Sequence, residues 1–156
     1  MHETPKVTII GRINTGKSTL FNRLTESRKA ITSNIPETTR DRNYGTVFWR
    51  GLSFQLIDTG GVDIDVLKNS IRSLAKKKPF KTRDSIEKSV IIQTQHAIKE
   101  CELILFLVDG KSGLLPQDRE LAKILKLTKK PVMIVVNKID NQKYHDRIYE
   151  FYSPLP

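Results

Sequence analysis

An α/β fold with a mostly parallel sheet is predicted from short apolar runs that alternate with amphipathic segments along the 156 residues. Strands are expected at Lys6–Ile10, Leu103–Val108 and Val132–Val136, because each is a short run rich in apolar and β-branched residues. Apolar residues at helical spacing lie between these runs. Strands that alternate with helices pair in parallel, so helices are expected on both faces of the sheet.

One antiparallel strand is expected at an edge of that sheet. Tyr44–Trp49 and Ser53–Ile57 alternate between apolar and polar residues, and only residues 50–52 separate them, which favours a hairpin. Arg28–Asp41 has little periodicity and is expected to be a loop. Helices are predicted at Lys17–Thr25, Asp65–Leu74 (ended by Pro79), Asp84–Cys101, Asp118–Leu127 and Asp146–Tyr152.

The composition indicates a single globular domain. Hydrophobic residues make up 38% of the chain and charged residues 28%, unlike a disordered or membrane-spanning protein. The apolar runs are far shorter than the ~20 residues of a membrane span. We expect no signal peptide, because residues 1–6 do not form a charged stretch followed by an apolar one. Cys101 is the only cysteine, which excludes an internal disulfide and suits a reducing cytoplasm. We expect Cys101 to be a small buried residue beside a strand.

The chain carries a formal net charge of +10. Such a charge favours an anionic partner, which is RNA, DNA or a membrane surface. A solvated lysine-rich surface without a partner is an equally good interpretation. Charge alone does not choose between these alternatives.

The segment Gly11–Ser18 (GRINTGKS) fits G-x-x-x-x-G-K-[ST] without a mismatch, between a predicted strand and a predicted helix. Its amides and the following helix N-terminus are expected to bind phosphate oxygens, which predicts a P-loop NTPase. Lys17 would reach the β- and γ-phosphates, and the Ser18 hydroxyl would ligate Mg²⁺. A chance glycine turn is the alternative. The nucleotide-binding candidates here are Gly11, Asn14, Thr15, Gly16, Lys17, Ser18 and Thr19.

Two further motifs follow predicted strands. In Asp58-Thr59-Gly60-Gly61, Asp58 can hold Mg²⁺ through water, and Gly60 or Gly61 can donate an amide to the γ-phosphate. In Asn137-Lys138-Ile139-Asp140, the carboxylate of Asp140 can accept two hydrogen bonds, from the N1 and N2 donors of guanine. Adenine lacks this pair of donors. Asn137 would tie this loop to the P-loop, while the Lys138 stem packs on the base. A plain turn is the alternative for each motif.

These motifs, in this order, resemble those of the translation-factor-related GTPases. The amino-acid sequence in and around them is most similar to that of the first G domain of the EngA/Der family. The similar segments are Gly11–Leu24, Thr39–Gly45, Leu56–Gly61, Asp109–Asp118, Ile134–Asp140 and Glu150–Ser153. Era-like and MnmE-like G domains share the core motifs and are the near alternatives. The resemblance implies a slow GTPase, stimulated by potassium, that binds GTP and GDP and acts as a switch in assembly of the large ribosomal subunit.

The resemblance also implies roles for single residues. Thr39 would close on Mg²⁺ and the γ-phosphate in the GTP state, and Asn14 would help to hold K⁺. Val62 stands where Ras-like enzymes carry a water-orienting glutamine, so hydrolysis would depend on backbone groups, K⁺ and Asp41 or Thr38. The implied catalytic residues are Lys17, Thr39 and Gly61, and the implied magnesium ligands are Ser18, Thr39 and Asp58.

The chain departs from the family pattern at several places. Ile13 and Thr15 replace the usual proline and valine of the P-loop, and a basic insertion covers residues 67–83. We expect residues 1–156 to be one G domain that is incomplete at its C-terminus, with an open edge at Val132–Val136 and weakened nucleotide affinity. The expected partner is a ribosomal subunit or rRNA, with neither DNA nor a membrane. A non-enzymatic RNA-binding module is the alternative function.

Overall fold

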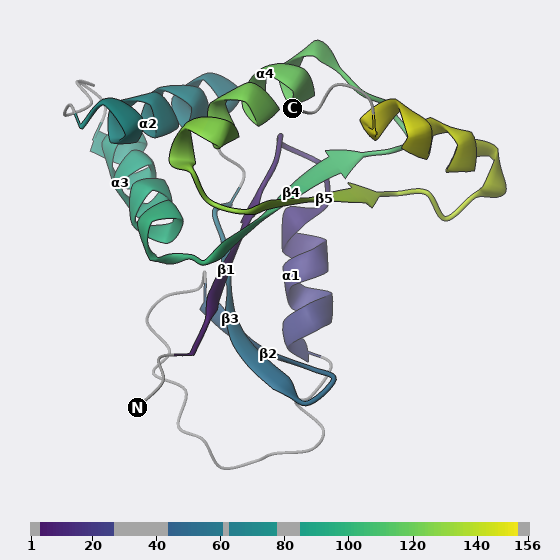
Figure 1. The fold of residues 1–156 in the computed structure, drawn as a ribbon, viewed down its shortest axis with the longest axis horizontal. Coiled ribbons are helices and arrows are strands. Elements are labelled where there is room, and N and C mark those ends of the chain that lie inside the picture. Colours follow the sequence, from purple (N-terminus) through teal and green to yellow (C-terminus); the bar gives the residue numbers. More distant parts are fainter. Residues whose placement is uncertain (1–3, 27–43, 61–62, 78–84, 153–156) are drawn as a thin grey trace.

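The structure is a computed structural model that describes residues 4–26, 44–60, 63–77 and 85–152. In chain order its elements are β1 (Lys6–Ile10), α1 (Lys17–Glu26), β2 (Tyr44–Trp49), β3 (Leu52–Asp58), α2 (Ile64–Lys76), α3 (Ser85–Glu100), β4 (Leu103–Asp109), α4 (Pro116–Leu125), the 3₁₀ helix η1 (Lys126–Thr128), β5 (Val132–Asn137) and the 3₁₀ helix η2 (Gln142–Phe151) (Figure 1). The predicted α/β class is confirmed.

The five strands form one sheet in the order β2-β3-β1-β4-β5. All neighbours are parallel except β2, which pairs with β3 in the antiparallel sense, as the hairpin prediction required. Parallel pairing brings the carboxyl ends of four strands to one edge, where ligands of such sheets bind. Within the described residues β5 lies at an open side of the sheet, as expected for Val132–Val136.

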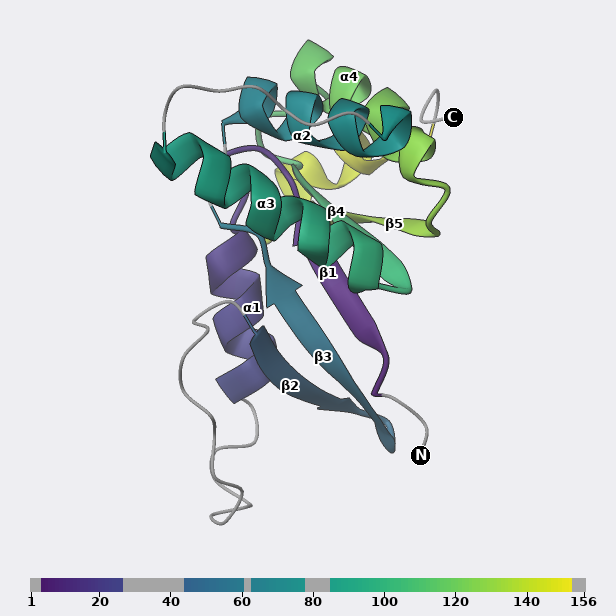
Figure 2. The ribbon, with the colours of Figure 1, turned by 90° about the vertical axis from the view of Figure 1, so that its left-hand side faces the viewer.

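Helices cover both faces of the sheet (Figure 2). On one face α1 packs on strand residues, and the buried members of this cluster are Val7, Ile9, Phe21, Val47, Leu56 and Leu107. On the other face α2, α3 and α4 enclose a larger cluster, whose fully buried members include Ile10, Leu67, Ile71, Ile104, Phe106, Leu121 and Leu125. Cys101 is buried in this second cluster, as the sequence predicted.

Some element boundaries differ from those predicted. The hairpin turn contains two residues, Arg50 and Gly51, because Trp49 already pairs with Leu52. Helix α4 begins at Pro116 rather than at Asp118, since proline fits the first helical position, where its missing N–H costs nothing. The last helix is 3₁₀ and begins at Gln142, where the side chain of Asn141 caps its first turn.

The first part of the segment that we predicted to be a basic insertion belongs to helix α2. Asp63 caps the N-terminus of α2, and the helix ends where Lys77 adopts the left-handed conformation at φ 51°, two residues before the predicted terminator. The predicted helix at Asp65–Leu74 is confirmed, and its apolar residues Leu67 and Ile71 are buried. Pro79 lies outside the described residues. Among the helices of the described part, none is long and apolar enough to cross a membrane.

Candidate functional site

The loop from Gly11 to Ser18 connects the end of β1 to the start of α1. A Cβ atom at Gly11 would lie 2.3 Å from the carbonyl oxygen of Leu107, so only glycine fits there. At Gly16 the backbone has φ +96°, and a Cβ atom would lie 2.4 Å from Nδ2 of Asn137. Both motif glycines therefore have a steric reason in this fold.

Lys17 is buried at the centre of the loop, with only 4% of its surface exposed. Its Nζ donates to the carbonyl oxygens of Gly11 at 2.8 Å and of Arg12 at 2.6 Å. Burial lowers the pKa of Lys17 below its ordinary value; the negative charge of Asp58 opposes this shift, and Arg12 adds to it. The loop thus encloses a cation at its centre.

Ser18 and Asp58 meet at the carboxyl edge of the sheet. The Ser18 hydroxyl donates to Oδ2 of Asp58 at 2.9 Å, and the amide of Gly60 donates to Oδ1 of the same carboxylate at 2.9 Å. The register of β1 against β3, which pairs Ile9 with Asp58, produces this juxtaposition. A hydroxyl and a carboxylate side by side are the oxygen donors that Mg²⁺ prefers.

The loop after β5 contacts the phosphate-binding loop directly. Nδ2 of Asn137 donates to the carbonyl oxygen of Thr15 at 2.9 Å, which is the expected tie between the two loops. Nζ of Lys138 donates to the carbonyl oxygen of Asn14 and, at 2.8 Å, to Oδ2 of Asp109. These contacts fix the relative position of the two loops, which come from opposite ends of the chain.

Asp109, at the end of β4, was not predicted as a site residue. Burial alone raises the pKa of its carboxyl, but the hydrogen bond from Lys138 and those from the amides of Ser112 and Lys111 outweigh burial, so the pKa is lowered. A charged Asp109 therefore holds Lys138 in place. Its position at the end of a central strand, one strand away from Asn137, was the available signal.

A cleft of about 600 Å³ lies between the two loops. Its lining residues are Gly16, Thr19, Arg23, Lys111, Val136, Asn137, Lys138, Ile139 and Asp140. Arg23 and Lys111 were missed by the sequence analysis, although Arg23 follows Thr19 by one helical turn and Lys111 follows a strand end. The cleft is lined by Asp140 at one place and by the end of the phosphate-binding loop at another.

The structure brings together the predicted residues that it describes, from Gly11 to Thr19, Asp58 and Asn137 to Asp140. Asn14 adopts a left-handed backbone at φ 63°, and its side chain is exposed. The predicted roles of Thr38, Thr39, Asp41, Gly61 and Val62 fall on residues outside the described part. They remain predictions.

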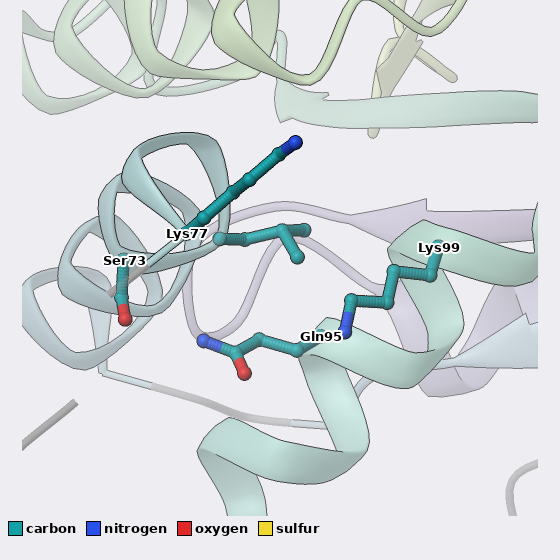
Figure 3. Close-up of a pocket in the computed structure, with 5 residues that line it drawn as sticks. Ser73, Lys77, Gln95 and Lys99 are labelled. Atoms are coloured by element: carbon teal, nitrogen blue, oxygen red, sulfur yellow. The ribbon is translucent and has the colours of Figure 1, made fainter. Parts of the chain in front are cut away.

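A second cavity, of about 500 Å³, lies between α2 and α3 and away from both loops. Its lining residues are Ser73, Leu74, Lys77, Gln95 and Lys99, and Gln95 points towards α2 (Figure 3). Nε2 of Gln95 donates to the carbonyl oxygen of Ser70 at 3.0 Å. Lys77 and Lys99 stand at helix C-termini, where positive charge offsets the helix dipole. Their placement therefore has a structural explanation.

The model of the 50S ribosome-binding GTPase family matches residues 6–138. This chain belongs to that family. The match contains β1 to β5, the phosphate-binding loop, Asp58 and Asn137, and ends at Lys138.

Individual family members agree with this assignment. GTPase Der from Caldicellulosiruptor saccharolyticus is 46% identical over 157 residues, covering 97% of this chain and 32% of that protein. GTPase Der from Finegoldia magna is 44% identical over 149 residues, covering 96% of this chain and 30% of that protein. The chain thus spans about a third of the length of the curated relatives it matches.

Two solved structures, of Era and of the FeoB G domain, have the same fold as this chain. Era from Aquifex aeolicus, bound to GDP.AlF4-, superposes with a TM-score of 0.66 at 29% identity, covering 97% of this chain and 47% of that one. The G domain of the FeoB iron transporter of T. maritima superposes with a TM-score of 0.57 at 25% identity, covering 94% of this chain and 80% of that one. The Der proteins share more of the sequence than Era does.

Proposed function

We propose that this chain binds GTP with Mg²⁺ and hydrolyses it to GDP, as a switch in assembly of the large ribosomal subunit. One observation carries the proposal: Asn137 holds Thr15, so a loop suited to guanine is attached to a loop suited to phosphates. Family membership and the identity to GTPase Der support the activity.

The phosphates would lie along residues 11–19, against the loop amides and the N-terminus of α1. An ammonium group has three N–H donors, and within the described residues two of those on Lys17 bond to loop carbonyls. The third would bind a β- or γ-phosphate oxygen. Because Lys17 is buried, its charge would act on the phosphates with little screening by water.

Ser18 and Asp58 fit a magnesium ion, since their oxygens lie 2.9 Å apart at the mouth of the loop. Ser18 would ligate the ion and Asp58 would hold it through water, with Thr39 as a further ligand in the GTP state. The ion would neutralise charge that develops on the phosphates.

The guanine base would occupy the cleft, with Asp140 accepting from its two N–H donors and Lys138 along its face. Asp140 is exposed on the cleft and therefore accessible to a base. ATP would leave Asp140 without these donors, which predicts selectivity for guanine nucleotides.

For hydrolysis we assign the stabilising groups to Lys17, to the amide of Gly61 and to Thr39. Asn14 would hold K⁺ beside the phosphates, where the ion would supply the charge that an arginine finger supplies elsewhere. Asn14 is exposed and therefore accessible to such an ion.

The deciding experiment is a titration of the purified chain with GDP, GTP and ATP, in potassium and in sodium buffer. We expect binding of GDP and GTP, no binding of ATP, and faster GTP hydrolysis in potassium than in sodium. The matched control is Lys17→Ala. Hydrolysis by the wild type no faster than by Lys17→Ala would refute the enzymatic proposal, and equal rates in the two salts would refute the role of K⁺.

A second candidate function is RNA binding without hydrolysis. It is favoured by the net charge of +10 and by exposed lysines at the end of α2, Lys76 and Lys77. Binding to 50S subunits that survives Lys17→Ala but weakens when residues 76–78 become alanine would support this candidate. Binding that depends on GTP and is insensitive to residues 76–78 would reject it.

A further inference from the structure

A buried ion pair joins the phosphate-binding loop to α4. Nε of Arg12 donates to Oδ1 of Asp118 at 2.7 Å, and Nη2 donates to Oδ2 at 3.3 Å. The side chain of Asp118 is fully buried, and that of Arg12 is 19% exposed. The amide of Leu115 donates a further hydrogen bond to Oδ2 at 3.1 Å. Both carboxylate oxygens are therefore engaged, and two hydrogen bonds to one carboxylate fix the orientation of the guanidinium.

Arg12 also contacts the interior of the phosphate-binding loop, through its backbone carbonyl. The carbonyl oxygen of Arg12 accepts from Nζ of Lys17 at 2.6 Å and from Oγ1 of Thr15 at 2.9 Å. A shift of the Arg12 peptide would therefore move an acceptor of the lysine that faces the phosphates. The side chain holds α4, while the backbone of the same residue orients Lys17.

The phosphate-binding loop is held at two places by different parts of the chain. Asn137 and Lys138, both in the recognised base motif, hold its middle through the carbonyls of Thr15 and Asn14. Arg12 occupies a variable position of the phosphate motif, and Asp118 belongs to neither nucleotide motif. The attachment to α4 thus involves none of the residue types that the two motifs specify.

We propose that Arg12 and Asp118 are positioning residues that hold the phosphate-binding loop in the shape that binds a β-phosphate. This inference rests on the proposed function of the loop. The pair acts through Lys17 and the loop amides, and itself contacts neither phosphate nor base. Loss of the two hydrogen bonds between Arg12 and Asp118 makes the loop around the β-phosphate less well fixed. It leaves the recognition of the guanine base unchanged.

Affinities for GDP and GMP, measured on the same variants, test this inference. GMP lacks the β-phosphate but presents the same base, so the ratio of the two affinities reports on the phosphate-binding loop. Arg12→Lys keeps the positive charge but cannot make the two hydrogen bonds of the guanidinium to Asp118. Asp118→Asn keeps the shape of the side chain but loses its negative charge. We expect each to reduce the preference for GDP over GMP by about tenfold.

The matched control is Ile124→Val, which removes one buried methylene from the same helix, within the hydrophobic core. It should lower the melting temperature by a few degrees and leave the GDP-to-GMP ratio unchanged. All measurements are made at a temperature where circular dichroism shows every variant to be folded. Arg12→Lys provides the test even if Asp118→Asn does not fold.

The outcomes separate the two levels of the argument. A reduced ratio in Arg12→Lys with an unchanged ratio in Ile124→Val supports the positioning role. A lower melting temperature with the wild-type ratio would make the pair a merely structural contact and overturn the inference. A wild-type chain that binds neither nucleotide would refute the proposed function and this inference with it.

Discussion

Nδ2 of Asn137 lies 2.9 Å from the carbonyl oxygen of Thr15, across 122 residues of sequence. This bond connects the end of β5 with the loop after β1, strands that are separated in the sheet by β4. A nucleotide that contacts both loops binds best if their spacing is already set, because less conformational freedom is lost on binding. The bond is therefore a means of preorganising the cleft.

Asn137→Ala should weaken GDP binding by about fivefold to tenfold, since one hydrogen bond of about 1 kcal/mol then has to be replaced on binding. Isothermal titration of both proteins checks this value. The matched control is Asn22→Ala, at an exposed position of α1. Equal loss of affinity in the two variants would show that the Asn137 contact has no particular role.

Gly16→Ala should weaken GDP binding at least as much as loss of the Asn137 contact does, while Gly51→Ala should leave it intact. Both glycines have positive φ, at +96° and +84°, so both substitutions carry a backbone strain of about 1–2 kcal/mol. At Gly51 nothing lies within 4 Å of the added Cβ, whereas at Gly16 that atom would lie 2.4 Å from Nδ2 of Asn137. The clash acts on the contact between the two loops.

Thermal unfolding with and without GDP separates these effects. Both variants should melt below the wild type without nucleotide. When GDP is added, Gly51→Ala should gain as much stability as the wild type does, and Gly16→Ala should gain less. If GDP stabilised Gly16→Ala as it does the wild type, the steric account of this glycine would be wrong.

The sheet, its antiparallel edge strand and most elements were predictable because they depend on local pattern. Alternating apolar runs identify strands, and the phosphate motif identifies the junction of β1 and α1. The start of α4 was placed two residues late because Pro116 was treated as preceding the helix rather than as its first residue. Lys77 ends α2 in a left-handed conformation for which the sequence gives no glycine signal.

The site was predictable where residues belong to contiguous motifs, and unpredictable where it depends on tertiary contacts. Arg12 and Asp118 are 106 residues apart, and an arginine at a variable position has no local feature that indicates its partner. From the sequence, Asp109 could be predicted only to lie at the end of a strand. Its bond to Lys138 depends on the register of β4 and β5, which pairs Asp109 with Asn137.

Asp140→Asn should shift the base preference of the cleft from guanine to xanthine nucleotides. The carboxylate of Asp140 accepts from two donors of guanine. The amide of asparagine has one acceptor and one donor group, which suits xanthine, because xanthine carries a carbonyl where guanine carries its amino group. Competition of GDP and xanthosine diphosphate for a labelled nucleotide measures the shift. Asp146→Asn, an exposed aspartate of η2 that does not line the cleft, is the control. An unchanged preference in Asp140→Asn would show that Asp140 does not contact the base.

GDP affinity should fall with rising pH, and at a lower pH than the ordinary lysine pKa of 10.5 would suggest. Burial lowers the pKa of Lys17 in the free protein. Below the lowered pKa the ammonium is charged and attracts phosphate, and above it the charge is lost, so affinity decreases with increasing pH. Guanine itself titrates in alkaline solution, so Lys17→Arg, which stays charged throughout, provides the reference curve. The wild-type affinity should fall more steeply than that of Lys17→Arg, and parallel curves would mean that the charge of Lys17 does not govern phosphate binding.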